Sequence, residues 1–253
     1  MENDDLPVGQ ILSRREALKL LGLTGAAFLA ACTPGASDIL EATSTPTQAT
    51  SATTSGALPA CVVRPEVTEG PYYVDEELNR SDIRADPSTG EVKEGALLTL
   101  TFNVSRVSDG SCTPLEGAKV EIWHCDADGV YSDASDPGFD TTGQKFLRGY
   151  QVTDANGQAT FVTIYPGWYS GRTVHIHFKI HHDTSDQSSV FISQLFFDDS
   201  LSDQVFSQEP YASRGQRDRL NSTDNIYNEQ LLLDVTQAGE GYAATFNIGL
   251  EMA

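Results

Sequence analysis

The sequence has 253 residues, of which 39% are hydrophobic and 21% are charged. This length is enough for one domain of ordinary size and a tail, and it is too short for a large multidomain protein. The 16 Lys and Arg residues against 36 Asp and Glu residues give a formal net charge of −20. This balance argues against nucleic acid as a partner, because phosphate neutralisation requires clustered cations. The sequence has no run of about 18 apolar residues, which excludes a protein with several membrane spans.

Residues 1–31 have the character of a targeting segment. The run SRREALK at 13–19 resembles the twin-arginine export signal, and the apolar stretch after it is too short and glycine-rich for a membrane span. That stretch ends in LAAC at 29–32, which resembles a bacterial lipobox. The sequence therefore predicts twin-arginine export and lipidation of Cys32, with the lipid as the only membrane anchor, at the cell surface or periplasmic face. A plain secretory peptide is the alternative.

Residues 32–60 are rich in Thr, Ser, Ala and Pro and poor in aromatic residues. Such a stretch buries too little apolar surface to offset its chain entropy. We therefore expect a flexible tether at 32–60 and one folded domain at 61–253.

The periodicity of the folded part is that of β-strands. Leu98, Leu100, Phe102 and Val104 alternate with polar residues, which is typical of a half-buried strand. Similar runs occur at 117–124, 148–152, 158–164, 172–181, 189–197, 231–235 and 242–250. Many short strands at this spacing predict an all-β fold, an antiparallel β-sandwich or barrel.

The breaks between these runs carry turn residues. Asn156-Gly157 lies between two runs and is a strong hairpin signal. Only 211–230 has room for short helical turns. Because strands and helices do not alternate along the chain, Rossmann and TIM-barrel folds are not expected.

Two histidines in the run RTVHIHF at 172–178 form an H-x-H pair. On a strand, His175 and His177 point to the same face about 6–7 Å apart, which suits two imidazoles that bind one metal ion. Alone the pair is weak evidence, since most such pairs are surface or core histidines. His181 is roughly 13 Å from His177 and cannot share the metal. We expect His181 and His182 to be solvated residues at the strand end.

Three motifs in series make the pattern more specific. EIWHCDADGVY at 121–131, FVTIYPGWY at 161–169 and RTVHIHF at 172–178 resemble the intradiol ring-cleavage dioxygenases, the family of catechol and protocatechuate dioxygenases. EGPYY at 69–73 and QLFF at 194–197 match as well, so the resemblance covers about residues 61–250. It implies the antiparallel β-sandwich of that family, with few helical turns.

The resemblance also implies a metal centre. In the family a non-haem ferric ion, Fe(3+), is bound by two tyrosinates and two histidines, which correspond here to Tyr131, Tyr169, His175 and His177. Hard ferric ion prefers anionic oxygen, and imidazole also suits iron. Two phenolates and one hydroxide cancel the charge of the ion, which lowers the cost of burying it.

The implied reaction is the cleavage of a catechol-type aromatic by O₂ between its two hydroxylated carbons, giving a cis,cis-muconate-type diacid. Arg172 would stabilise negative charge that develops on the substrate, and Tyr169 would leave the metal and accept a proton. Gln194 would orient a ligand or the substrate. The loop from Tyr169 to His175 is shorter than in many intracellular relatives, which leaves the substrate open.

Several of these residues have a structural alternative. Tyr131 could be a corner tyrosine, Tyr165 competes with Tyr169 as a ligand, and Arg172 could be a solvated strand residue. His124 and Trp123 are expected to be structural.

The segment that contains Gly70, Pro71 and Tyr72, followed by Tyr73, either lines the substrate cavity or only docks the N-terminal arm.

The remaining cysteines bear on the fold of an exported protein, in which a disulfide is permissible. Cys112 and Cys125 flank one strand and would lie over about 20 Å apart. Any disulfide should then involve Cys61 and leave one thiol free, with the partner of Cys61 open.

Two other functions compete with the dioxygenase: a non-catalytic surface binding module and an H-x-H copper or zinc enzyme. The sequence does not determine the oligomeric state.

Overall fold

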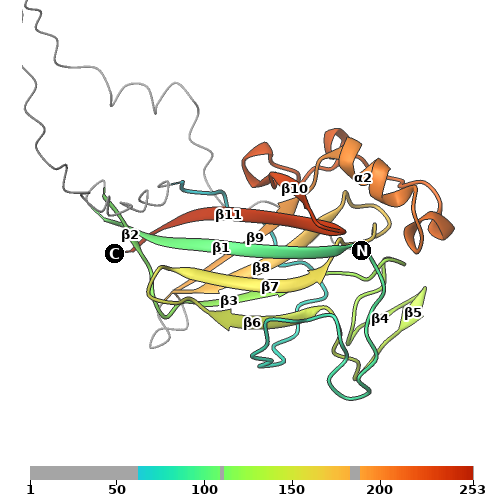
Figure 1. The fold of residues 1–253 in the computed structure, drawn as a ribbon, viewed down its shortest axis with the longest axis horizontal. Helices are drawn as coiled ribbons and strands as arrows, with labels where there is room; N and C mark the ends of the chain where they lie inside the picture. The colour runs from blue at the N-terminus through green and yellow to red at the C-terminus, as the bar shows by residue number, and fades with distance from the viewer. Residues whose placement is uncertain (1–61, 109–110, 183–188, 253) are drawn as a thin grey trace, which may run out of the picture. The chain divides into compact units, whose positions relative to one another are not determined.

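The computed structural model describes residues 62–108, 111–182 and 189–252, which form a two-layered β-sandwich (Figure 1). The first layer, the β1 sheet, contains β10 (Val235–Ala238), β11 (Gly241–Glu251), β1 (Leu97–Ser108), β2 (Ser111–Pro114) and β7 (Gln158–Ile164). The second layer, the β8 sheet, contains β6 (Arg148–Val152), β3 (Lys119–Trp123), β8 (His175–His181) and β9 (Val190–Phe196). A short ribbon is formed by β4 (Ser135–Asp136) and β5 (Phe139–Asp140). The all-β prediction is confirmed.

β1 is the central strand of its sheet. It pairs antiparallel with β7 and β2 on one side and parallel with β11 on the other. Every other pair among the named strands of the described residues is antiparallel. The parallel pair was not predicted, because an alternating pattern shows which face a residue occupies but not the direction of the neighbouring strand.

The turn at Asn156-Gly157 is not a hairpin, and that prediction is wrong. The Asp154 carboxylate accepts the backbone N–H groups of Asn156 and Gln158, and Gly157 has a φ of +73°. The turn is therefore formed as its residues predict. It leads, however, from β6 in the β8 sheet to β7 in the β1 sheet. A local turn signal does not say which sheet the next strand joins.

Helical structure is sparse. One α-helix, α2 (Asp199–Phe206), is capped by the Asp198 carboxylate, which accepts the Leu201 N–H at 2.9 Å. Three 3₁₀ turns follow at Tyr211–Arg214, Asn221–Thr223 and Glu229–Leu231. These turns fall close to the expected interval, whereas α2 precedes it and was missed. Within the described residues no helix has the length and apolar character that a membrane span requires.

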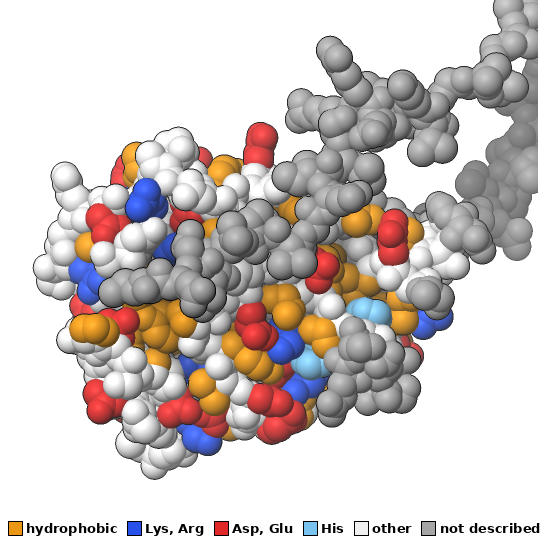
Figure 2. Space-filling view, turned by 180° about the vertical axis from the view of Figure 1, so that it is seen from behind, with side chains coloured by type: hydrophobic (Ala, Val, Ile, Leu, Met, Phe, Trp, Pro, Cys, Tyr) orange, Lys and Arg blue, Asp and Glu red, His pale blue; other side chains and the backbone are white. Residues whose placement is uncertain are grey.

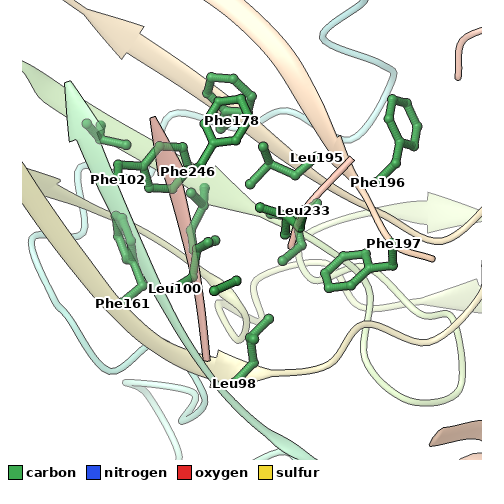
Figure 3. Packing of buried hydrophobic residues seen from close by; sticks show 14 of the residues in the cluster. Leu98, Leu100, Phe102, Phe161, Phe178, Leu195, Phe196, Phe197, Leu233 and Phe246 are labelled. Carbon is green, nitrogen blue, oxygen red and sulfur yellow. The ribbon is translucent and has the colours of Figure 1, made fainter. Parts of the chain in front are cut away.

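The core lies between the two sheets. Figure 3 shows Leu98, Leu100 and Phe102 of β1 facing side chains of the opposite sheet such as Phe178 and Leu195. Phe102 and Phe178 are both fully buried, with ring centroids 5.3 Å apart. Such interdigitation of the inner faces is how two sheets of a sandwich pack.

Alternation along β8 places the two histidines of the H-x-H pair on the other side of the sheet. Ile176, Phe178 and Ile180 point into the core and are fully buried. His175 and His177 therefore point to the outer face, yet they are only 3% and 2% exposed. Segments outside the sandwich must cover them.

One covering segment is the N-terminal arm, which we define as residues 66–80. Its backbone is bonded to the β8 sheet, with the Val67 N–H donating to Ile192 O and the Tyr150 N–H donating to Leu78 O. Lys179 of β8 forms an ion pair with Glu69 at 2.6 Å. On the face of the molecule that Figure 2 shows, acidic and basic side chains lie next to one another, although the net charge of the chain is −20.

The described cysteines are in different states. Cys125 is a buried free thiol, and Cys112 is disulfide-bonded. The predicted targeting segment, the lipidation site Cys32, the tether at 32–60 and Cys61 lie outside the described residues.

Candidate active site

His175 and His177 of β8 approach each other through their ring nitrogens. The Nε2 atoms of His175 and His177 are 3.0 Å apart, and the rings are nearly perpendicular, with an interplanar angle of 79°. The Tyr131 hydroxyl lies 3.2 Å from His175 Nε2. Tyr131 is 1% exposed. Three of the four predicted metal ligands thus converge on one buried point.

A backbone contact determines the tautomer of His175. Its Nδ1 lies 2.7 Å from the carbonyl oxygen of Thr173, and a carbonyl only accepts, so Nδ1 carries the proton. The Nε2 lone pair then faces His177 and Tyr131. This is how a neutral imidazole is prepared to bind a metal through Nε2.

His177 is held by packing. Its ring lies parallel to Trp123, with centroids 5.1 Å apart and an interplanar angle of 6°. On another side is Gly70, whose φ is +75° and where an added Cβ would lie 2.9 Å from His177 Cε1. His177 Nδ1 is buried without a hydrogen-bond partner. Trp123 is thus structural, as expected, and the ring that it supports is that of a predicted ligand.

Burial keeps these groups neutral. It lowers the pKa of His175 to about 3, aided by the charge of Arg172, and it lowers the pKa of His177 well below the usual value. Burial also raises the pKa of Tyr131, so this phenol keeps its proton unless a cation displaces it. Buried neutral imidazoles with facing lone pairs and a buried phenol beside them fit the donor set that ferric ion prefers.

Tyr169 reaches the same cluster from the loop after β7. Its ring centroid is 5.8 Å from that of Tyr131. Its hydroxyl lies 2.5 Å from the Tyr72 hydroxyl and 3.2 Å from Asp136 Oδ2, and Tyr72 donates to the same carboxylate oxygen at 2.7 Å. Hydrogen bonds from Tyr72 and the Gly138 N–H lower the pKa of Asp136.

The N-terminal arm contributes directly to the site. The Tyr72 ring stacks on Tyr131, with centroids 4.5 Å apart, and Gly70 lies against His177 as described above. Pro71, between them, is exposed. Tyr73 instead packs on Trp123 and donates to Glu121 at 3.3 Å. The arm is therefore both docked on the β8 sheet and in contact with the predicted ligands.

Arg172 is fixed by two polar partners. Its Nη2 donates to Gln194 Oε1 at 2.7 Å, and its Nε donates to Asp224 Oδ2 at 2.9 Å. Gln194 is opposite His177 in the β8–β9 pair and donates to Thr68 O at 2.9 Å. Arg172 precedes β8 and its side chain is 16% exposed. It is not the solvated strand residue of the alternative.

The competing tyrosine lies elsewhere. The Tyr165 hydroxyl is 2.8 Å from Ser202 Oγ, and its ring packs on Phe197 and Phe206 in the core. His124 is also occupied, with its ring nitrogens 2.8 Å from Cys125 O and 2.7 Å from Thr163 Oγ1, as a structural residue should be.

The expectation for His181 is wrong. Its Nε2 lies 2.9 Å from Oε2 of Glu121 on the neighbouring strand β3, and its side chain is 23% exposed, so it is a paired, half-buried residue. His182 Nδ1 is buried. Both histidines are half-buried rather than freely solvated, because His181 pairs with a carboxylate of β3 and the His182 N–H donates to Ser189 O.

Two carboxylates of the site were missed by the sequence analysis. Asp136 lies in the short β4–β5 ribbon, and Asp224 follows a 3₁₀ turn. Neither lies in a motif, and their role depends on contacts with residues distant in sequence. Among the described residues, no group of three or more His, Cys, Asp and Glu side chains is placed to hold a metal. The candidate centre therefore depends on tyrosines.

The profile of a family described as "Dioxygenase" matches residues 68–251. The protocatechuate 3,4-dioxygenase beta chain of Burkholderia cepacia is 32% identical over 192 residues, which cover 71% of this chain and 76% of that protein. The structure of an intradiol ring-cleavage dioxygenase from Tetranychus urticae has a TM-score of 0.65 at 34% identity and covers 76% of this chain and 95% of that one.

A catechol 1,2-dioxygenase of Candida albicans is 31% identical over 134 residues, which are 45% of this chain but only 41% of that longer protein.

Fold and site define a β-sandwich that gathers two phenols and two neutral imidazoles on the outer face of one sheet. The chain belongs to the intradiol ring-cleavage dioxygenase family, and it is an oxidoreductase.

Proposed function

We propose that this protein uses a ferric ion to cleave a catechol-type aromatic with O₂ and releases a cis,cis-muconate-type diacid. The convergence of His175 Nε2, His177 Nε2 and the Tyr131 hydroxyl supports this most directly, since within the described part of the chain these three atoms have only one another as hydrogen-bond partners. Tyr169 would complete the ligand set. When bound, the ion supplies a Lewis acid that deprotonates phenols and makes a bound catechol reactive towards O₂.

Proton transfer falls to Tyr169. A catechol loses two protons when both of its oxygens become anionic. The Tyr169 phenolate, released from the ion, would take up one of them, and the hydroxide that completes the charge balance of the resting site would take up the other. The Tyr169 Oη already has two partners outside the metal cluster, Tyr72 Oη and Asp136 Oδ2. These groups would hold the protonated Tyr169 to one side while the substrate occupies the site.

Charge stabilisation falls to Arg172. Its guanidinium is close enough to contribute to the lowered pKa of His175, and Gln194 and Asp224 fix its orientation. A fixed cation beside the reacting ring stabilises negative charge that develops in the transition state. The arm residues Gly70 and Tyr72 close the site from the other side, which limits access of water.

Two of the relatives are a protocatechuate 3,4-dioxygenase and a catechol 1,2-dioxygenase, and we propose a small catechol as substrate here. We also propose export by the twin-arginine pathway and a lipid anchor at Cys32. Cell fractionation of the wild type and of Cys32→Ala tests the anchor, because only the wild type should stay with the membrane fraction.

Catalysis is tested by incubating the purified, iron-loaded protein with catechol, hydroxyquinol and protocatechuate in air. The proposal predicts oxygen uptake and a ring-opened diacid that contains both atoms of ¹⁸O₂ for at least one of them. A semialdehyde product would show cleavage outside the two hydroxylated carbons. A protein that retains zinc or copper and consumes no oxygen with any catechol would contradict the proposal.

A further inference from the structure

The loop between two predicted ligands, Tyr169 and His175, contains no strand. It has one internal backbone hydrogen bond, which the Arg172 N–H donates to Tyr169 O at 3.1 Å. A loop with so little internal bonding does not by itself keep Arg172 and His175 in place. Groups from elsewhere in the chain must do so. They come from the segment around the 3₁₀ turn Asn221–Thr223.

Asp224 makes three contacts with its buried carboxylate. Oδ2 accepts Arg172 Nε at 2.9 Å and the Thr173 N–H at 2.8 Å, while Oδ1 accepts the Ile226 N–H at 2.7 Å. The Asp224 side chain is 2% exposed. Its partners Arg172 and Thr173 are adjacent in the loop, so one carboxylate ties both a guanidinium and the backbone to the same point.

Asn221 secures the same loop residue through its side chain. The Thr173 hydroxyl donates to Asn221 Oδ1 at 2.6 Å, and Asn221 Nδ2 donates to Phe197 O at 2.8 Å. Thr173 is thereby held at its N–H and at its hydroxyl. Its remaining polar group, the carbonyl, accepts His175 Nδ1. The orientation of the His175 ring thus depends on a residue that Asp224 and Asn221 hold.

The charge of Asp224 matches this role. Burial alone would raise the pKa of Asp224, but the charge of Arg172 and the N–H groups of Thr173 and Ile226 hold the pKa below its usual value. Asp224 therefore stays anionic. Arg172 is bonded on one side to this carboxylate and on the other to Gln194, which leaves its guanidinium a single orientation.

We infer that Asp224 and Asn221 are positioning residues of the candidate active site, which fix Arg172 and the His175 ring through Thr173. Neither residue touches the predicted ligands. The inference rests on the proposed function. Residues that support metal ligands in this indirect way typically change metal affinity or activity about 10- to 100-fold when they are replaced.

The test is ferric ion binding by Asp224→Asn, measured by titration of the metal-free protein and by its visible spectrum. The amide has nearly the same shape but only one acceptor oxygen, so either Oδ2 contacts or the Oδ1 contact must face an NH₂ group. We expect the affinity for ferric ion to fall about 10- to 100-fold, the tyrosinate charge-transfer band to shift, and kcat to fall more than KM changes. Asp224→Glu, which keeps the charge, should recover part of the loss.

Asp86→Asn is the matched control. Asp86 is also buried, at 4% exposed, and its oxygens accept the N–H groups of Ser88, Thr89 and Lys145, none of which belongs to the candidate site. Its replacement should lower stability without changing iron affinity or the spectrum. Unchanged iron binding, spectrum and turnover in Asp224→Asn would overturn the inference.

If Asp224→Asn does not fold, Thr173→Val tests the inference instead, because this variant removes only the hydrogen bond from the Thr173 hydroxyl to Asn221. A loss of iron affinity supports the inference, and wild-type affinity contradicts it. The wild type separates the two proposals. Failure of the wild type to bind ferric ion or cleave any catechol would overturn the proposed function and this inference together, whereas an active wild type with an unaffected variant would overturn the inference alone.

Discussion

The hydroxyls of Tyr72 and Tyr169 lie 2.5 Å apart although the residues are 97 positions apart in the chain, and both are hydrogen-bonded to Asp136 Oδ2. The N-terminal arm, the loop after β7 and the β4–β5 ribbon thus meet at one carboxylate. This contact gives a predicted ligand, Tyr169, an alternative set of partners at the edge of the candidate centre.

Replacement of Asp136 by Asn should therefore impair catalysis without unfolding the protein. The amide has one acceptor oxygen, so either the two hydroxyls at Oδ2 or the Gly138 N–H at Oδ1 would face an NH₂ group, and the negative charge beside Tyr169 would be lost. We expect a loss of turnover of about 10- to 100-fold, the range for residues that support a metal ligand. Asp140→Asn, in the same ribbon, is the control, because among the described residues the Asp140 carboxylate accepts hydrogen bonds only from Thr142. Equal activity of the two variants in an oxygen-uptake assay would refute a role for Asp136.

Gly70 should be sensitive to a single methyl group. An alanine here would have to adopt a left-handed backbone conformation, which costs about 1–2 kcal/mol. Its Cβ would lie only 2.9 Å from His177 Cε1. Gly90 has the same φ of +75° but no atom within 4 Å of an added Cβ. Both Gly70→Ala and Gly90→Ala should be less stable in urea, but only Gly70→Ala should bind ferric ion more weakly. A similar affinity for ferric ion in both variants would contradict a role of Gly70 in positioning His177.

His124 should make the metal-free protein less stable in mild acid. Burial lowers its pKa to about 4, from a usual value near 6.5. Above pH 6.5 the residue is neutral in both the folded and the unfolded protein. As the pH falls from about 6.5 towards 4, the unfolded chain takes up a proton that the folded protein refuses, so the free energy of unfolding decreases.

In His124→Gln this contribution is absent. The free energy of unfolding of the variant should fall less steeply over this interval, by up to about 1.4 kcal/mol per pH unit. Urea titrations of both metal-free proteins at several pH values measure the difference. His175 and His177 are present in both proteins, so the comparison isolates His124. Parallel curves would show that His124 has the same pKa in the folded and the unfolded protein, which would contradict the prediction.

Much of the fold follows from the sequence. The alternation of Leu98, Leu100 and Phe102 places β1 in the core, and the spacing of His175 and His177 places both on one face of β8. Strand partners were harder to predict. Asn156-Gly157 forms its turn but joins two sheets, because the choice of partner strand depends on packing far away in the chain.

The ligand candidates could be predicted from the sequence, whereas the residues that support them could not. Tyr131, Tyr169 and the two histidines lie in motifs whose spacing matches a known family. Asp136 and Asp224 lie in irregular segments, and only the folded chain brings them to Tyr169 and to Arg172. A single sequence contains no local signal for contacts of this kind.

The central claim is that Tyr131 binds a ferric ion together with His175 and His177. The most direct measurement is the iron content and visible spectrum of the purified protein beside Tyr131→Phe, which keeps the ring that stacks on Tyr72 but lacks the hydroxyl. We predict one iron per chain and a red-brown tyrosinate charge-transfer band in the wild type, and a loss or large shift of that band in the variant. A colourless, iron-free wild type, or a band that is identical in Tyr131→Phe, would contradict the account.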